Sequence, residues 1–129
     1  MGVREDAMSL EIIITERHAG TYLVAMEGRL DTNTYFDFDE KVAPLLTGSA
    51  RLLILDMAKL DYLSSMGLRS INLARRAMKS HEGHVVFTNL QPLIQKIFEI
   101  VSPLPEEVVF AGVEEADRYF DWLQKKESE

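Results

Sequence analysis

Residues 52–55 form an uninterrupted aliphatic run, Leu-Leu-Ile-Leu, which ends at Asp56. A strand with one face in water alternates apolar and polar residues, whereas a parallel strand covered on both faces loses that alternation. Residues 51–56 therefore predict a central strand with helices packed on both sides. The chain has 129 residues, which is one domain by length and enough to bury a single core around this strand.

Two strand patterns precede the central strand. Residues 10–18 and 21–28 are separated only by Ala19 and Gly20, and a two-residue break of this kind predicts an antiparallel hairpin. Leu10, Ile12 and Ile14 share one face of the first strand, and Ile13 indicates cover on its other face as well. An exposed edge strand near the N-terminus also leaves open pairing with a second copy, and hence a homo-oligomer.

Helix and strand patterns alternate along the rest of the chain. Thr32 or Asn33 can cap a helix that Pro44 should bend or end, a second helix follows a serine pair, and Pro92 opens a third. Leu93, Ile94, Ile97, Phe98 and Val101 are the expected buried side of that third helix. Strands at residues 84–88 and 108–111 and a helix over residues 113–124, with Ala116, Tyr119, Phe120 and Leu123 inward, complete the order.

The resulting order, ββαβαβαβα, predicts one α/β domain with a mixed, mostly parallel sheet whose crossovers are right-handed. Residues 1–9 are expected to be a flexible leader and residues 125–129 a polar tail, which leaves residues 10–124 for the folded domain. The net charge of −7 argues against direct nucleic-acid binding, and no apolar run is long enough for membrane insertion. The absence of cysteine excludes disulfides and thiolate chemistry and fits a cytoplasmic location.

Residues 60–69, Leu-Asp-Tyr-Leu-Ser-Ser-Met-Gly-Leu-Arg, follow the central strand and open a helix with two serines. A helix start presents unpaired N–H groups and a positive dipole end, so a serine there can accept a phosphate without strain. The residues alone leave a second interpretation open, in which Ser64 and Ser65 merely cap the helix, each hydroxyl contributing about 1 kcal/mol.

The pattern Asp-x-x-x-Leu-x-Tyr-Leu-Ser-Ser-x-Gly-Leu-Arg, residues 56–69, resembles the signature of the STAS family, the anti-sigma-factor antagonists and their relatives. Residues 28–31, Gly-Arg-Leu-Asp, resemble the Gly-x-Leu-Asp element that closes the second strand of these domains. Aligned on Gly67, the target serine of the phosphorylated members falls on Ser65, with Ser64 as the alternate. Ser64 then stands in place of an acidic residue, and Met66 in place of a second hydroxyl.

The resemblance implies an anti-sigma-factor antagonist that binds a serine-kinase anti-sigma factor, is released by phosphorylation of Ser65 and is reset by a phosphatase. Neighbouring strands would bring the loop of Asp31, Thr32 and Asn33 beside Ser65, although helix capping is an alternative role for that loop. Asn89 follows the next strand and is expected at the same edge. The predicted partner-binding residues are Asp31, Thr32, Asn33, Ser64, Met66, Gly67, Arg69 and Asn89.

Two other functions stay open. The departures at Ser64 and Met66 favour a constitutive STAS scaffold or an accessory subunit of a membrane transporter that is not phosphorylated. Binding of a small ligand or nucleotide at the same edge has no dedicated motif.

An enzyme is not expected, and no catalytic residue or cofactor is predicted. Leu63 replaces the first glycine of a Gly-x-Ser-x-Gly elbow, and no Walker or Gly-x-Gly-x-x-Gly loop is present. His81 and His84 lack an obvious third metal ligand, so they are predicted to be solvated loop histidines and no metal site is expected.

Overall fold

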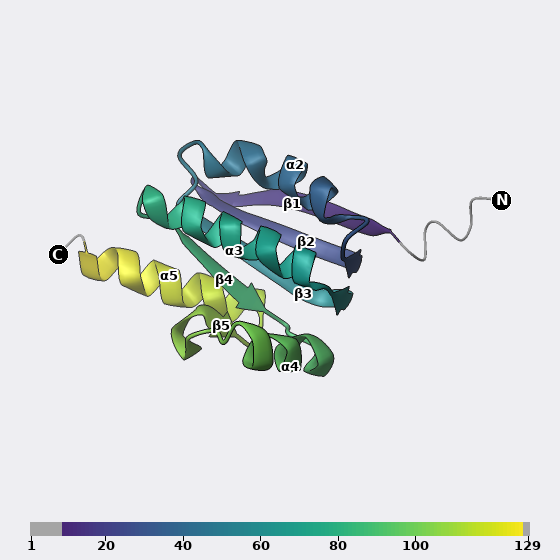
Figure 1. The fold of residues 1–129 in the computed structure, drawn as a ribbon. Coiled ribbons are helices and arrows are strands. Elements are labelled where there is room, and N and C mark those ends of the chain that lie inside the picture. The colour runs from purple at the N-terminus through teal and green to yellow at the C-terminus, as the bar shows by residue number, and fades with distance from the viewer. Residues whose placement is uncertain (1–8, 128–129) are drawn as a thin grey trace.

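The computed structural model describes residues 9–127. Its elements follow the chain as β1 (Leu10–His18), β2 (Thr21–Leu30), α2 (Tyr35–Leu46), β3 (Leu52–Leu63), α3 (Ser65–Ser80), β4 (His84–Thr88), α4 (Pro92–Val101), a short 3-10 turn η1 (Glu106–Val108), β5 (Val109–Phe110) and α5 (Val113–Glu127). The predicted order of strands and helices and the opening hairpin are confirmed (Figure 1).

The sheet has five strands in the order β1-β2-β3-β4-β5, which puts β3 at its centre as predicted. β1 and β2 pair antiparallel, and the other three pairings are parallel. β1 forms one edge, so pairing of this strand with a second copy remains a prediction.

Two apolar layers hold the sheet. The larger joins β1–β4 to α2, α3 and α4 and contains the buried Phe38, Ile71, Ile94 and Phe98. Figure 1 shows α2 and α3 running side by side across the strands. The smaller layer packs Ala116 and Phe120 of α5 against β3 and β4. The expected cover on both faces of β1 is wrong at Ile13, which is 56% exposed. α5 contacts β1 through the ion pair between Arg17 and Asp117, but it packs its buried apolar side chains against β3 and β4.

The central strand is longer than the sequence indicated. Residues 57–63 do not form a connection after Asp56 but extend β3 to Leu63, paired with the second half of β2. Register shifts between Ala25 and Glu27 and between Gly28 and Arg29 accompany this extension, and they break the two-residue alternation that marks a strand. β4 ends at the level of Asp56, so the extension has β2 as its only strand neighbour within the described sheet.

Several predicted helix details differ from the structure. The N-cap position of α2 is Thr34, not Thr32 or Asn33, and the Thr34 side chain makes no capping hydrogen bond; the helix continues past Pro44 to Leu46. In α4, Ile94 and Phe98 are buried, but Leu93 and Val101 are exposed because they flank the narrow contact stripe. In α5, Ala116 and Phe120 face inward, while Tyr119 is 37% exposed.

The C-terminal helix extends further along the chain than predicted. α5 runs to Glu127, so residues 125–127 of the predicted polar tail are helical. The predicted leader falls mainly on residues 1–8, outside the described residues; the carbonyl of Ser9 accepts a hydrogen bond from the Arg29 N–H (3.1 Å). Across residues 9–127, no helix combines the length and the apolar character that a membrane crossing requires.

Candidate functional site

The loops that follow β2 and β3 lie next to each other. The two strands are parallel neighbours, and their last residues, Leu30 and Leu63, are paired in the sheet. The prediction that the Asp31 loop sits beside Ser65 is therefore confirmed. We call this surface the serine edge; its members are Asp31, Thr32, Asn33, Ser64, Ser65, Met66, Gly67 and Arg69.

The two serines occupy different positions at the start of α3. Ser64 is the N-cap: its backbone is extended, and its Oγ accepts a hydrogen bond from the N–H of Gly67 (3.3 Å). Its own N–H donates to the carbonyl of Leu30 (3.0 Å), which ties the helix start to the end of β2. Ser65 is the first helical residue and is exposed, and its hydroxyl has no hydrogen-bond partner among residues 9–127. Capping therefore explains Ser64 but not Ser65.

Gly67 lets α3 approach β2 closely. A Cβ built on this glycine would lie 2.5 Å from the carbonyl oxygen of Leu30 and 2.8 Å from its Cγ. Any larger residue would have to move the end of β2 or the start of α3. Gly67 thus sets the spacing between the two loops of the serine edge and is itself buried.

Asp31 organises its loop through its own side chain. Its Oδ1 accepts from the Asn33 N–H (2.9 Å), and its backbone carbonyl accepts from the N–H groups of Thr34 (3.1 Å) and Tyr35 (2.9 Å). Thr32 and Asn33 are exposed. The loop is therefore a rigid turn that leaves two short polar side chains free for contact with a partner.

Three residues of this site were missed from the sequence. Thr34 is 4% exposed; its hydroxyl donates to the carbonyl of Arg29 (2.7 Å) and accepts from the N–H of Asp31 (2.9 Å). The Arg29 guanidinium lies 4.4 Å from the ring centre of Tyr62 and 3.4 Å from the Asp31 carboxylate. Arg29 and Tyr62 are paired across the sheet, which the sequence could reveal only if β3 were known to reach residue 63.

Asn89 does not lie with the other predicted residues. Its side-chain amide donates to Asp56 Oδ1 (2.9 Å), at the point where β4 ends. β3 continues from Asp56 to Leu63 before the serine loop begins, about 23 Å at roughly 3.3 Å per strand residue. The expectation that Asn89 shares the serine edge is therefore wrong, because the strands of this sheet end at different levels.

The two histidines predicted in the loop differ in burial, since His84 is exposed and is the first residue of β4. His81 is half-buried, and its Nε2 lies 3.0 Å from the carbonyl oxygen of Ala50. The ring of His84 contacts Phe120 edge-on, with 5.5 Å between centroids. The prediction of a solvated histidine is wrong for His81, because the turn after α3 folds back over the start of β3. Among residues 9–127, no group of three His, Asp or Glu side chains is arranged to hold a metal ion.

Residues 13–116 match the model of the STAS domain, and the chain therefore belongs to the STAS family. It is 27% identical over 81 residues to BtrV of Bordetella bronchiseptica, a candidate anti-sigma factor antagonist, with 63% of this chain and 70% of BtrV covered. The resemblance drawn from residues 56–69 is thus confirmed at the level of the family.

Two solved structures illustrate the range of the fold. The phosphorylated form of the Bacillus cell fate determinant SpoIIAA superposes with a TM-score of 0.70 at 20% identity, covering 84% of this chain and 99% of SpoIIAA. The murine anion transporter Slc26a9 superposes with a TM-score of 0.73 at 14% identity, covering 91% of this chain but 23% of the transporter. At these identities the likeness establishes the fold alone.

Proposed function

We propose that this protein is an anti-sigma-factor antagonist that binds a serine-kinase anti-sigma factor and is released when Ser65 is phosphorylated. The observation that carries the proposal is the division between the two serines. Ser64 supplies the helix cap, while the Ser65 hydroxyl is exposed and unbonded at the electropositive end of a sixteen-residue helix. A nucleophile in this position is open to the active site of a kinase.

A phosphate on Ser65 would be well tolerated by the domain itself. The helix N-terminus favours the added charge of about −1.5 to −2, and the first turn of α3 holds no acidic residue. Arg69 is exposed four positions further along, a spacing at which helical side chains meet, so it can pair with the phosphate. Ser64 caps the helix without placing a negative charge beside the Ser65 hydroxyl.

The same phosphate would oppose a docked partner. The partner surface in this proposal combines Asp31, Thr32 and Asn33 with Ser64, Met66 and Arg69, while the buried Gly67 sets the spacing of the two loops beneath it. Phe36, in the first turn of α2, is 59% exposed and extends it with an apolar contact. A protein packed over this surface would have to desolvate the phosphate, so binding weakens while the fold is unchanged. A phosphatase would restore binding, and an ATP-dependent partner is consistent with a cytoplasmic complex.

The test is phosphorylation by the kinase that copurifies with the protein or is encoded beside it. The kinase and ATP are mixed with wild type and with Ser65→Ala, and intact masses are compared. We expect one added phosphate in the wild type and none in Ser65→Ala. Ser80→Ala, at the exposed far end of the same helix, is the matched control and should be modified like the wild type. A phosphate on Ser65→Ala but not on Ser64→Ala would transfer the proposal to the alternate serine.

A second candidate is a constitutive scaffold or accessory subunit of a membrane transporter. It is favoured by Ser64 and Met66 at the positions that depart from the phosphorylated members. This candidate predicts stable copurification with a transporter that Ser65→Asp does not weaken. The antagonist predicts that Ser65→Asp lowers affinity for the kinase at least about tenfold, since a desolvated charge costs more than 1.4 kcal/mol.

A further inference from the structure

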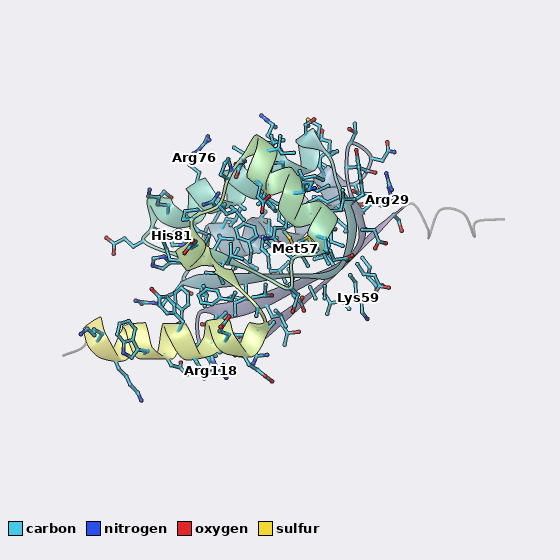
Figure 2. The ribbon with its side chains drawn as sticks, turned by 90° about the horizontal axis from the view of Figure 1, so that it is seen from below. Arg29, Met57, Lys59, Arg76, His81 and Arg118 are labelled. Carbon is cyan, nitrogen blue, oxygen red and sulfur yellow. The ribbon has the colours of Figure 1, made fainter. Side chains whose placement is uncertain are left out.

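A concave surface lies at the end of the sheet opposite the serine edge. It is a groove of about 1090 Å³, between the C-terminal half of α3, the start of β3 and β4, and Phe120 of α5. Its polar lining carries the side chains Arg51, Arg75, Arg76, Lys79, His81 and His84, and we call it the basic groove. Figure 2 shows Arg76 and His81 at one end of the molecule and Arg29 at the other.

The positive charge in the basic groove is not neutralised by neighbouring carboxylates. Glu82 is the one acidic residue among those that line it. Among residues 9–127, none of the four cationic residues of the groove forms an ion pair with a carboxylate. The chain as a whole carries −7, which makes this local excess of positive charge contrary to the overall composition.

Stabilisation of the helix dipole does not account for this cluster. The C-terminus of a helix carries about half a negative charge, and the effect is confined to the last turn. Lys79 is in that turn, but Arg75 lies further back and Arg51 comes from the segment that precedes β3. Cations from three separate positions of the chain converge on one cavity.

Arg75 is held in place before any ligand arrives. It is half-buried: one of its terminal nitrogens donates to the side-chain carbonyl of Asn72 (3.4 Å), and its guanidinium lies 5.7 Å from the ring centre of Phe87. Asn72 in turn donates to the hydroxyl of Ser102 at the end of α4 (3.4 Å). Burial lowers the pKa of Arg75 from its usual value, because a partly desolvated cation lacks a compensating anion.

The remaining lining suits the organic part of a ligand. Leu52, Val85 and Val108 provide apolar contacts, and Phe120 adds an aromatic edge that already packs against His84. Small-molecule sites in proteins are typically cavities of about 300–1000 Å³ that combine such a lining with a few convergent polar groups. A concave groove of this size at one end of an acidic domain does not offer the long basic track that a nucleic acid requires.

We propose that the basic groove binds a phosphate-bearing small molecule, with Arg75 and Arg51 engaging its phosphate oxygens. Guanidinium groups donate two parallel hydrogen bonds to phosphate, so they recognise this anion better than a single-atom charge. Arg76, Lys79 and the two histidines supply further donors at the rim. The site is separate from Ser65 and does not depend on the function proposed for that residue.

Titration calorimetry with tripolyphosphate, ATP and GTP tests the proposal. Tripolyphosphate carries the phosphate charge alone, whereas ATP and GTP add a nucleoside. The comparison therefore shows whether the groove binds inorganic phosphate chains or nucleotides. We expect saturable binding that weakens with salt and is at least about tenfold weaker in Arg75→Gln, because one charge-assisted hydrogen-bonded group is lost. Arg118→Gln, an exposed arginine outside the groove, removes the same charge and should bind like the wild type.

A folding defect in Arg75→Gln is controlled in two ways. Arg51→Gln removes a cation from a different segment and should weaken binding similarly. In the wild type, the ring resonances of His81 and His84 should shift on addition of tripolyphosphate. Absence of binding and of histidine shifts would overturn the proposal. Equal loss in Arg75→Gln and Arg118→Gln, or competition by single-stranded RNA with higher affinity than any of the three ligands, would overturn it as well.

Discussion

Ser64 and Ser65 are adjacent in the chain, yet their substitution should change the free energy of unfolding by different amounts. Ser64→Ala removes the hydroxyl that accepts from the Gly67 N–H and should lower the free energy of unfolding by about 1 kcal/mol. Ser65→Ala removes an exposed, unbonded hydroxyl and should change it by less than about 0.5 kcal/mol. Urea denaturation of both variants measures the difference.

Ser64→Asp is the informative control for the cap. Aspartate caps helices as well as serine does and favours the positive end of the dipole, so this variant should keep the stability of the wild type. If Ser64→Ala were as stable as Ser65→Ala, the cap bond would contribute nothing and the assignment of roles to the two serines would lose its basis.

Gly67→Ala tests the close contact between α3 and β2. Alanine in a helix normally gains up to about 1 kcal/mol over glycine. Here its Cβ would meet a backbone oxygen at 2.5 Å, which no side-chain rotation can relieve, and overpacking of this kind costs about 1–3 kcal/mol. We therefore expect a net loss of stability in urea denaturation, together with weaker binding at the serine edge.

Gly48→Ala is the matched control for Gly67→Ala. The nearest atom to a Cβ at Gly48 is the Pro44 carbonyl oxygen at 3.7 Å, an ordinary contact, and its backbone is not left-handed. Reduced freedom of the unfolded chain should leave this variant equally stable or more stable by up to about 1 kcal/mol. Equal behaviour of the two variants would mean that the helix and β2 can move apart freely.

The sequence predicted some residues of the serine edge and missed others. Ser65, Gly67 and Asp31 could be proposed because residues 28–31 and 56–69 resemble elements of the STAS family, whereas the residue types alone left helix capping open. The separate roles of Ser64 and Ser65 could not be predicted, because they depend on the residue at which α3 begins. Thr34 acts through local hydrogen bonds to Arg29 and Asp31, which residue type alone does not specify. Arg29 contacts Tyr62 across the sheet, and that contact cannot be predicted without the register of β2 and β3.

Among the elements, the extension of β3 is the feature that shapes the serine edge. Residues 57–63 project beyond β4 and would leave the strand edge open to pairing with other chains. Gln91, the residue before α4, covers this edge: its side-chain amide donates to the carbonyls of Ala58 and Leu60, both at 2.8 Å. One side chain thus replaces two hydrogen bonds of a missing strand.

Gln91→Ala should therefore destabilise the extension. Two hydrogen bonds at a partly exposed edge contribute about 1–2 kcal/mol in total, and urea denaturation should show a loss of this size. Gln95→Ala, an exposed glutamine one turn later in α4, serves as control and should stay within about 0.5 kcal/mol of the wild type. A loss no larger than that of the control would show that water satisfies these carbonyls equally well.

Elements inside the sheet were easier to predict than their ends. The order of strands and helices follows from apolar periodicity, because each pattern must bury one face against the same core. The end of β3 does not, since β3 carries one extra residue opposite β2 at each register shift, and this displaces Met57, Leu60 and Leu63 from strict alternation while they stay buried. A strand that ended at Asp56 would place the serine loop level with Asn89. Because β3 continues to Leu63, the serine loop lies seven residues further along the strand, away from Asn89.

On the scale of the whole molecule, α3 connects the serine edge at one end of the domain to the basic groove at the other. Its N-terminus carries Ser65, and its C-terminal half lines the basic groove. Ser65 and Arg75 are ten residues apart, about 15 Å along the helix axis. Two unit charges at this distance in water interact by about 0.3 kcal/mol before screening, and a Debye length of about 8 Å at physiological salt reduces that further.

The two ends should therefore respond independently. In a double-mutant cycle, the effects of Ser65→Asp and Arg75→Gln on the free energy of unfolding should add to within about 0.5 kcal/mol. Ser65→Asp should likewise leave the affinity for tripolyphosphate within about twofold, whereas Arg75→Gln should leave phosphorylation of Ser65 unchanged. A coupling energy above about 1 kcal/mol would contradict independence. It would mean instead that α3 shifts as a rigid body and carries a signal from the groove to the serine edge.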